Sequence, residues 1–266
     1  MDLTGKTAVV TGAGSGIGAG ICRVLFRHGA NVALIDIDES TCQKVADELP
    51  ESDGRTSVHK ADVRSVEDIQ NIANEIINLW GKVDILVNNA GVYGAAEWFN
   101  YDIPREEDWE ATYQVNVKGI YKTTDAFSGH MMKNRYGKII NIASIASRRG
   151  SDRGMHYNAS KAAALSVTQG YALRLAPYNI NVNAICPGLL WTPMFDQITA
   201  RHSSHTEGFV GMDQREIFDT IVERDIPLKR EQTPEDIGNV AAFLASDEAF
   251  NITGQGINVS GGLFMN

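Results

Sequence analysis

Short apolar, β-branched runs alternate along the chain with longer segments of helical periodicity. In Val32–Ile35 and Ile85–Val87 the apolar residues follow one another directly, as expected for strands that are covered on both faces. Apolar residues recur at helical spacing over Ile69–Trp80, which Gly81 follows, and over Ala162–Leu175. The expected strands are Thr7–Val10, Asn31–Asp36, Ser57–Ala61, Val83–Asn88, Lys138–Ala143, Ile180–Cys186 and Gly256–Val259.

Strands that alternate with helices are typical of a parallel sheet with helical crossovers. We therefore predict an α/β fold in which residues 1–266 form a single domain, a Rossmann-like doubly wound sheet of about seven parallel strands with helices on both faces. The periodicity lapses between Met194 and Asp225, and long irregular excursions inside a compact domain are usually lids or disorder. Because ligands bind beyond the carboxyl ends of the strands in such sheets, we expect a substrate lid at about residues 190–226.

The composition favours a small-molecule substrate. The chain has 266 residues and a formal net charge of −9, without a long Lys or Arg run, which argues against nucleic acid or a membrane surface as the main partner. Cys22, Cys42 and Cys186 have no C-x-x-C spacing. This spacing argues against a disulfide framework or a thiolate zinc site and favours a reducing cytoplasm.

We expect neither a targeting segment nor a metal site. Met1–Lys6 lacks the basic-then-apolar order of a signal peptide, and no apolar stretch approaches the ~20 residues that span a bilayer. His202 and His205 lie in the irregular segment without a nearby carboxylate or cysteine cluster, so we predict that no metal binds there.

A glycine-rich turn separates the first predicted strand from a helical segment. It reads Thr11-Gly12-Ala13-Gly14-Ser15-Gly16-Ile17-Gly18, with the spacing G-x-x-x-G-x-G rather than G-x-G-x-x-G. Glycines let the backbone approach a cofactor, and a helix N-terminus offers amide donors to a diphosphate. Taken alone, the glycines are also compatible with a simple turn.

Asp36 supports a dinucleotide site and indicates which dinucleotide binds. It lies eighteen positions after Gly18 at the end of the second predicted strand, where a carboxylate accepts hydrogen bonds from the adenosine ribose and repels a 2′-phosphate. Ile37 follows instead of an arginine, and the glycine turn contains no Lys or Arg, so NAD is the predicted cofactor. The alternative for Asp36 alone is a helix cap.

Two further strand ends carry candidate cofactor contacts. Asp62 would reach the adenine amino group and Val63 would pack on its ring, although Asp62 is equally compatible with a helix N-cap. In Asn88–Gly91, Asn89 would bond neighbouring backbone, while Ala90 and Gly91 leave room for the nicotinamide ribose. Without the other residues, this run would be an ordinary turn.

Tyr157 and Lys161 form the candidate acid/base pair. Four positions apart in a helical segment, they share one helix face. A phenol has a pKa near ~10, and an ammonium about 5 Å away at an effective dielectric of ~20 would lower that pKa by about two units. Such a tyrosine would serve as an acid/base near neutral pH, whereas an isolated Y-x-x-x-K is usually a solvent-facing pair.

Ser144 and Asn116 complete the candidate catalytic set. Ser144 follows the fifth predicted strand, where its hydroxyl would polarise a substrate oxygen beside the tyrosine. Asn116 lies in the preceding helical stretch and would hold a water that relays protons to Lys161, although by itself it would be another polar helix residue.

Together these motifs resemble the short-chain dehydrogenase/reductase family over essentially the whole chain. The resemblance implies that Tyr157 is the general acid/base, that Ser144 orients the substrate, that Lys161 binds the nicotinamide ribose and lowers the tyrosine pKa, and that Asn116 supports a proton relay. It further implies a homotetramer built on helices near Glu107–Lys133 and Tyr157–Ala176. The matching residues are Thr11-Gly12-x-x-x-Gly16-Ile17-Gly18, Asp62-Val63, Asn88–Gly91, Asn116, Ser144, Tyr157-x-x-x-Lys161 and Pro187-Gly188, to which Thr192 adds an expected contact with the nicotinamide carboxamide.

The implied reaction interconverts a secondary alcohol, such as a polyol, diol or hydroxy acid, and its ketone with NAD. Ser147–Gly150 and Thr192–Met194 resemble the polyol and acetoin (butanediol) dehydrogenase branches. The predicted substrate-binding residues are Ser144, Ala146, Arg149, Tyr157 and Trp191, with Tyr93, Trp98, Ile145, Arg148, Arg153, His156, Met194 and Phe195 around the same pocket.

Three alternatives stay open. An NADPH-dependent ketoreductase of an acyl thioester is opposed by Asp36. The arginines close to Ser144 allow an anionic hydroxy substrate, although such residues are more often solvated on the surface. A non-catalytic nucleotide-binding scaffold is opposed by the complete set of four catalytic residues, one of which such a scaffold would typically have lost.

Overall fold

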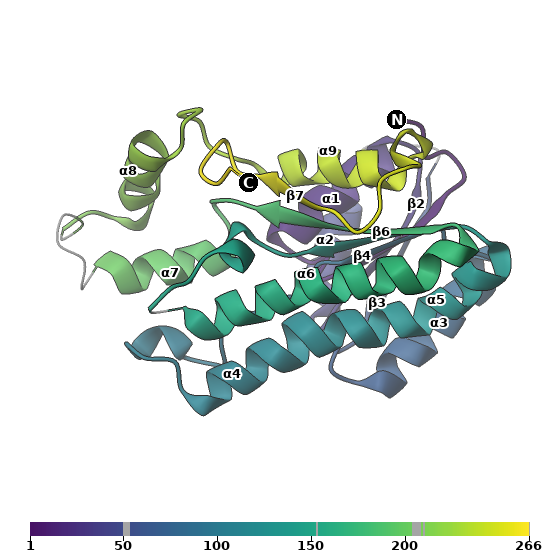
Figure 1. Cartoon of the computed structure of the whole chain (residues 1–266), viewed down its shortest axis with the longest axis horizontal. Coiled ribbons are helices and arrows are strands. Elements are labelled where there is room, and N and C mark those ends of the chain that lie inside the picture. Colours follow the sequence, from purple (N-terminus) through teal and green to yellow (C-terminus); the bar gives the residue numbers. More distant parts are fainter. Residues whose placement is uncertain (50–53, 153, 204–208, 210, 266) are drawn as a thin grey trace.

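Seven parallel strands form one sheet in the order β3-β2-β1-β4-β5-β6-β7 (Figure 1). The computed structural model describes residues 1–49, 54–152, 154–203, 209 and 211–265. The strands are β1 (Thr7–Thr11), β2 (Asn31–Asp36), β3 (Thr56–Lys60), β4 (Ile85–Asn88), β5 (Gly137–Ile142), β6 (Ile180–Pro187) and β7 (Gly256–Val259). This architecture confirms the predicted fold class.

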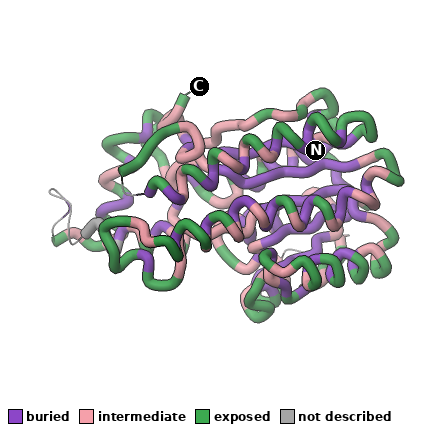
Figure 2. Tube along the Cα trace, turned by 60° about the horizontal axis from the view of Figure 1, so that its bottom comes forward, coloured by how far each residue is buried: buried purple, intermediate pink, exposed green. Residues whose placement is uncertain are grey.

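Helices cover both faces of the sheet, as the continuous apolar runs of the strands require. Val9 faces one core, while Ala8 and Val10 face the other. Side chains of α1, α2 and α9 pack on one face and those of α3, α5 and α6 on the other, and Figure 2 shows the strands buried between them. The helices are α1 (Gly16–Arg27), α2 (Glu39–Asp47), α3 (Val66–Trp80), α4 (Glu106–Thr112), α5 (Ile120–Asn134), α6 (Met155–Leu175), α7 (Pro193–Ser203), α8 (Gln214–Asp225) and α9 (Pro234–Ala245).

The strand order reverses at β1, which pairs with β2 on one side and β4 on the other. Val9 lies opposite Ala33 of β2 and Leu86 of β4. Chain connections therefore leave in opposite directions beyond the carboxyl ends of these strands, which is where ligands bind in open α/β sheets. The glycine turn follows β1 at this point.

The segment in which the periodicity lapses contains two helices that the sequence pattern did not predict. Helices α7 and α8 extend away from the sheet at the left of Figure 1. Their apolar residues Phe195, Phe218 and Val222 pack in a small separate cluster with Ile226 rather than on the sheet. A helix that buries only a few residues against another short helix shows a weaker helical repeat of apolar residues in its sequence than a helix that covers a sheet.

A π-helix, Tyr113–Gly119, joins α4 to α5, so the helical stretch expected near Glu107–Lys133 is continuous but locally widened, with hydrogen bonds between residues five positions apart. Insertions of this kind often mark functional sites. Asn116 lies within it. No helix in the described part of the chain is long and apolar enough to cross a membrane.

Candidate active site

A cleft of about 1090 Å³ runs along the carboxyl ends of the strands. It extends from Asp36 and Asp62 at one end to Ser144 and Tyr157 at the other, and α7 contributes Met194, among others, to its wall. Most predicted site residues line it. They are Gly12, Ser15, Gly16, Ile17, Asp36, Asp62, Val63, Asn89, Ala90, Gly91, Ser144, Ala146, Arg149, Tyr157, Lys161, Pro187, Gly188 and Thr192.

The glycine turn after β1 packs against the residues that follow β4, at the place where the strand order reverses. Gly12 has a φ of 64°, and a Cβ on it would lie 2.8 Å from the Ala90 Cα. The Asn89 side-chain amide donates to the carbonyls of Thr11 (3.0 Å) and Gly12 (2.8 Å). Gly18 does not line the cleft, because it packs against the Gly12 carbonyl and lets the turn close on α1.

The start of α1 fits a diphosphate group. Ser15 is the N-cap but makes no side-chain capping bond, and the first hydrogen bond of the ladder runs from the Ala19 amide to the Ser15 carbonyl. The amides of Gly16, Ile17 and Gly18 therefore precede the ladder. Such amides, at the positive end of the helix dipole, are donors for an anion.

Asp36 is not a helix cap. Its carboxylate accepts the amides of Gly14 (3.0 Å) and Asp38 (3.3 Å), whereas Asp38 caps α2 by accepting the Ser40 amide (3.0 Å). The cap alternative is therefore wrong. The two amides hold the Asp36 carboxylate at the edge of the cleft beside the glycine turn.

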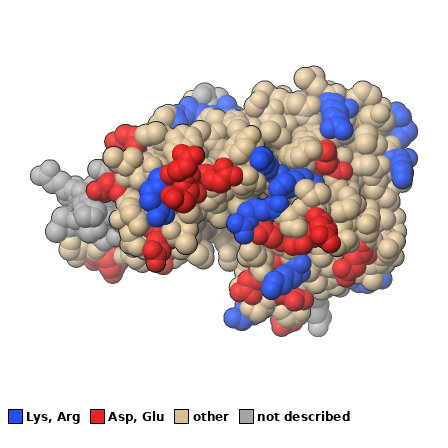
Figure 3. Space-filling model, turned by 90° about the horizontal axis from the view of Figure 1, so that it is seen from below, with Lys and Arg blue, Asp and Glu red and all other residues tan. Residues whose placement is uncertain are grey.

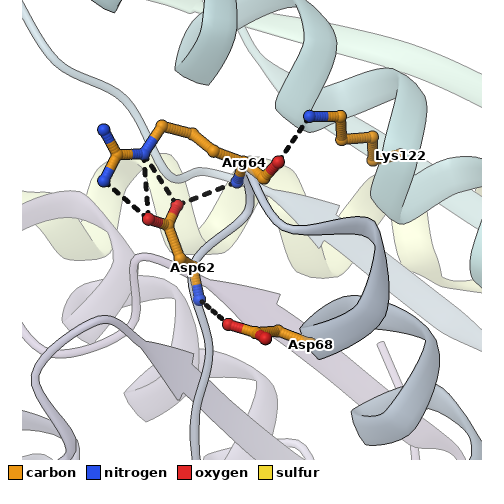
Figure 4. A network of polar contacts seen from close by, with 4 residues as sticks. All are labelled: Asp62, Arg64, Asp68 and Lys122. Carbon is orange, nitrogen blue, oxygen red and sulfur yellow. Dashed lines mark hydrogen bonds and ion pairs between the residues drawn. The ribbon is translucent and has the colours of Figure 1, made fainter.

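Asp62 is not a cap either, because the Ser65 hydroxyl caps α3 by accepting the Asp68 amide (3.1 Å). Its carboxylate instead binds the Arg64 side chain and the Arg64 amide (Figure 4). Hydrogen bonding to the guanidinium holds the pKa of Asp62 below its usual value. Arg64 also lines the cleft, a placement that our reading of the sequence missed.

A buried polar network lies beneath the site. The Asn88 side chain donates to Asn141 (2.8 Å) and Thr124 (3.1 Å) and accepts from the Thr123 hydroxyl, and Asn141 donates to Thr168 (2.9 Å). These bonds join β4 and β5 to α5 and α6. Only Asn88 was singled out from the sequence, and the polar residues inside otherwise apolar segments were the available signal for the others.

Tyr157, Ser144 and Lys161 meet at the far end of the cleft. The Ser144 hydroxyl lies beside the Tyr157 phenol, whose pKa it lowers, and accepts the Ala146 amide (3.1 Å). The Lys161 ammonium lies 5.7 Å from the Tyr157 ring centroid and donates to the Ile142 carbonyl (2.8 Å). The residues predicted from β5 and α6 are thus brought together.

The pKa of Tyr157 runs against the sequence-based expectation. Burial raises the pKa of Tyr157 to about 12, and the hydrogen bond with Ser144 lowers it without offsetting the burial. Burial also lowers the pKa of Lys161 to about 8. The expected lowering of the phenol pKa by Lys161 is not found in this structure, because desolvation raises that pKa and Lys161 is not among the groups that lower it.

The Asn116 side chain is bound on both its polar atoms. Its oxygen accepts the Val92 amide (2.8 Å), and its nitrogen donates to the Val92 carbonyl and the Ser160 hydroxyl (both 2.9 Å). A Cβ on Gly91 would lie 3.3 Å from the Asn116 oxygen and 3.4 Å from the Lys161 ammonium. Asn116 thus fixes the strand end beside Lys161, and its part in a proton relay stays a prediction.

Aromatic side chains form the substrate end of the cleft. The Tyr93 ring stacks on that of Tyr157, with centroids 4.8 Å apart and planes at 20°, and lies 4.3 Å from the Trp98 ring. Phe195 and Ile198 of α7 lie on the same wall. A bound substrate would therefore meet mainly apolar surface around the Tyr157 hydroxyl.

The family follows from this constellation and from comparison with known sequences. A family model described as enoyl-(acyl carrier protein) reductase matches residues 12–264. The chain belongs to the short-chain dehydrogenase/reductase family. This membership confirms the resemblance, and members of the family use nicotinamide cofactors.

Two curated relatives and a solved structure illustrate the family. Oxidoreductase UcpA of Salmonella typhimurium is 40% identical over 261 residues, 98% of this chain and 95% of that protein. The NAD-dependent glycerol dehydrogenase of Listeria innocua is 38% identical over 264 residues, 98% of this chain and 95% of that protein. The structure of a variant of actinorhodin polyketide ketoreductase with NADPH has a TM-score of 0.85 at 33% identity, covering 97% of each chain.

Three residues of this short-chain dehydrogenase/reductase lie elsewhere than expected. His156 does not line the cleft but is buried, with its ring 5.4 Å from that of Tyr93. Trp191 does not line the cleft. Its ring packs on Phe218 (5.4 Å) and Arg215 (5.4 Å), beside a smaller cavity of about 360 Å³ behind the glycine turn. The Arg148 guanidinium donates to the Gly256 carbonyl (2.7 Å), so it supports β7 rather than the substrate.

Some predictions concern residues outside the described part of the chain. They include Arg153 and the side chains of His202 and His205. The prediction that no metal binds at the two histidines therefore stays a prediction. Arg149 remains a candidate for contact with an anionic substrate, since it is exposed at the rim of the cleft.

Proposed function

We propose that this protein is an NAD-dependent oxidoreductase that interconverts a secondary alcohol and its ketone, with Tyr157 as the general acid/base. The observation that carries the proposal is the placement of Ser144 beside the half-buried Tyr157, whose pKa it lowers, in the cleft that Asp36 and the glycine turn also line. Substrates such as polyols, diols and hydroxy acids have the hydroxyl group that this arrangement would bind.

Each side chain at this end of the cleft would have its own role in the reaction. In ketone reduction Tyr157, which is protonated at neutral pH because burial raises its pKa to about 12, gives its proton to the carbonyl oxygen. In alcohol oxidation the phenolate takes the hydroxyl proton. The Ser144 hydroxyl orients the substrate oxygen and lowers the pKa of the phenol, and Lys161 would bind the nicotinamide ribose. The nicotinamide group, when bound, accepts or supplies the hydride.

The charges at the other end of the cleft support NAD rather than NADP. Asp36 presents a carboxylate where a 2′-phosphate would lie, and Ile37 follows it. Among the described residues, the cations that line the cleft are Arg64, Arg149 and Lys161, and Arg64 is paired with Asp62. The relative named as an NAD-dependent glycerol dehydrogenase points the same way.

A second candidate is an NADPH-dependent ketoreductase that acts on an acyl thioester. The similarity to a ketoreductase solved with NADPH and the match to the enoyl-(acyl carrier protein) reductase model favour it. Asp36 opposes it. A third candidate, a dehydrogenase of an anionic hydroxy substrate, rests on Arg149 at the rim.

A substrate screen distinguishes these candidates. Purified protein would be incubated with NAD or NADP and with polyols, vicinal diols, hydroxy acids and hydroxyacyl thioesters, while the absorbance of the reduced cofactor is followed. We expect oxidation of a neutral secondary alcohol with NAD and loss of turnover in Tyr157→Phe. Comparable turnover in Tyr157→Phe would contradict the acid/base assignment, and a clear preference for NADP with a thioester would favour the second candidate.

We also propose that the protein is a cytoplasmic homotetramer. The side chains of Tyr113, Tyr121 and Leu173 are largely exposed, at 50%, 50% and 81%, on the helices that the family would use for assembly. Acidic and basic side chains are interspersed on the face in Figure 3, which supports a small molecule as partner rather than a polyanion. The three cysteines are free and buried, as suits a reducing compartment. Light scattering after gel filtration would test the assembly.

A further inference from the structure

Tyr93 covers one face of the Tyr157 ring at the substrate end of the cleft. The centroids of the two rings are 4.8 Å apart and their planes are inclined by only 20°. Two rings stacked in this way are in direct contact, so no carbon atom of a substrate fits between them. Tyr93 also lines the cleft. It therefore forms a wall directly beside the proposed acid/base.

The Tyr93 side chain is packed on several sides. The Trp98 ring lies 4.3 Å from it with the planes at 35°, and the His156 ring stands nearly perpendicular to it at 5.4 Å, both measured between centroids. A Cβ on Gly154 would overlap the Tyr93 hydroxyl, so this hydroxyl rests against the backbone at the start of α6. The ring cannot turn aside for a substrate without breaking these contacts.

The backbone on both sides of Tyr93 is held as well. The Asn116 side chain accepts the Val92 amide (2.8 Å) and donates to the Val92 carbonyl (2.9 Å). On the other side, the buried Asp108 carboxylate accepts the Ala95 amide (2.9 Å). Tyr93 is consequently a fixed part of the wall rather than a mobile surface residue.

The cleft is closed on the side of Tyr93 and open on the side of β5. The 3₁₀ turn η1 (Trp98–Asn100) lies against α7, so the loop after β4 and this helix meet beyond the Tyr93 ring. On the other side, residues 149–152 line the cleft and are exposed. A secondary alcohol at Tyr157 would therefore place one substituent against a closed aromatic wall and the other toward an exposed polar rim.

We propose that Tyr93 determines substrate specificity by limiting one substituent of the secondary alcohol to a small group, such as methyl or hydroxymethyl. The other substituent extends toward residues 149–152, where it can be longer and more polar. The preferred substrates are thus alcohols that react at the carbon next to the end of a chain. This inference rests on the proposed function, because it requires that Tyr157 acts on a secondary alcohol.

Isomeric alcohols test the inference in the full-length protein. In octan-2-ol, octan-3-ol and octan-4-ol the smaller substituent grows from methyl to ethyl to propyl, while the composition stays the same. Butane-2,3-diol, hexane-3,4-diol and octane-4,5-diol form a parallel series with a hydroxyl on the other substituent. For the wild type with NAD we expect kcat/KM to fall at least about tenfold with each added carbon, whereas in Tyr93→Ala it should fall less than about threefold.

The ratio of kcat/KM values within one variant cancels any general loss of activity. Tyr93→Phe keeps the ring and should keep the wild-type ratios, because the ring rather than the hydroxyl fills the space. Tyr93→Leu is a milder substitution, which should give intermediate ratios and replaces Tyr93→Ala if that variant does not fold. Tyr178→Ala removes an exposed tyrosine from the turn after α6 and serves as the control.

Two results would overturn the inference within these series. One is equal use of the three octanols by the wild type, and the other is an unchanged steep fall in Tyr93→Ala and Tyr93→Leu. A wild type that oxidises other secondary alcohols but no member of either series would also overturn it, while the proposed function would stand. A wild type that oxidises no secondary alcohol with NAD or NADP would overturn the proposed function as well.

Discussion

The Lys161 ammonium lies 5.7 Å from the Tyr157 ring centroid but gives a hydrogen bond to the Ile142 carbonyl, 2.8 Å away. Lys161 is buried and Tyr157 is half-buried, and desolvation disfavours the charged form of each. The group that lowers the pKa of Tyr157 in this structure is Ser144. Ser144 therefore affects the pKa of Tyr157, whereas the buried charge of Lys161 affects the stability of the fold. Separate experiments can measure the two effects.

Replacing Ser144 should change the pH dependence of the reaction. Burial raises the pKa of Tyr157 to about 12, so the phenolate fraction, and with it alcohol oxidation, should rise with pH through the neutral range. Ser144→Ala removes the hydrogen bond that lowers this pKa, so the rise should move to higher pH. We also expect kcat/KM to fall by about a hundredfold, as for loss of a donor to a substrate oxygen.

The measurement is kcat/KM for alcohol oxidation at saturating NAD from pH 6 to the highest pH at which both proteins stay folded, because the two profiles differ in shape only near the Tyr157 pKa. Ser166→Ala, which changes an exposed serine of α6, serves as the control. An unaltered pH profile in Ser144→Ala would show that the serine does not act on the tyrosine.

Replacing Lys161 should stabilise the fold while removing activity. Burial lowers the pKa of Lys161 to about 8 from an unfolded value of 10.5, so the folded state binds this proton less tightly than the unfolded state. Stability is therefore lost as pH falls through the folded pKa and rises between about pH 8 and pH 10.5. Lys161→Met should gain about 2 kcal/mol at pH 7, the burial penalty less the lost hydrogen bond to Ile142.

Urea unfolding of wild type and Lys161→Met at pH 7 and pH 10 measures this effect. The difference between the two proteins should shrink at the higher pH, and Lys133→Met, at an exposed site on α5, should show no such trend. A variant that is less stable than wild type at pH 7 would mean that the lysine charge is better solvated than its burial indicates.

Replacing Asp36 should change the choice of cofactor. Its carboxylate is held beside the glycine turn by the amides of Gly14 and Asp38, and it would repel a 2′-phosphate. In Asp36→Ala we expect the ratio of kcat/KM for NADP to that for NAD to rise at least about tenfold, since about 1.4 kcal/mol of removed repulsion is sufficient. Asp38→Asn is a matched control, because asparagine preserves the cap of α2. Equal discrimination in wild type and Asp36→Ala would remove the argument for NAD.

The sheet was predictable because each strand is buried on both faces. Ala8, Val9 and Val10 alternate between two cores, so consecutive apolar residues were needed and were visible in the sequence. The same holds for Ile85–Val87 in β4. The start of β4 was predicted two residues too early, at Val83. Val83 and Asp84 are buried like strand residues but precede the strand, which begins at Ile85.

Side-chain direction beyond the strand ends was not predictable. Trp191 follows β6 closely but packs on Phe218 of α8, and no local pattern distinguishes that outcome from contact with a substrate. The pairing of Arg64 with Asp62 and the approach of Tyr93 to Tyr157 likewise depend on how loops cross the sheet. Residues in the strands, in the helices and in the turns directly after strands were located correctly, whereas the directions of Trp191 and Arg148, which tertiary packing sets, were not.

The close approach of α1 to α9 leads to a stability prediction. A Cβ on Gly20 of α1 would lie 2.6 Å from the Pro234 carbonyl carbon at the start of α9, and backbone atoms cannot yield as a side chain does. Gly20→Ala should therefore destabilise the protein by about 1–3 kcal/mol, as overpacking does elsewhere.

On α6, a Cβ on Gly170 would meet no heavy atom of the described chain within 4 Å. Gly170→Ala should accordingly stabilise the protein by about 0.5–1 kcal/mol through helix propensity. Thermal and urea unfolding of the two variants should shift in opposite directions, and a neutral or stabilising Gly20→Ala would mean that α1 and α9 can move apart at little cost.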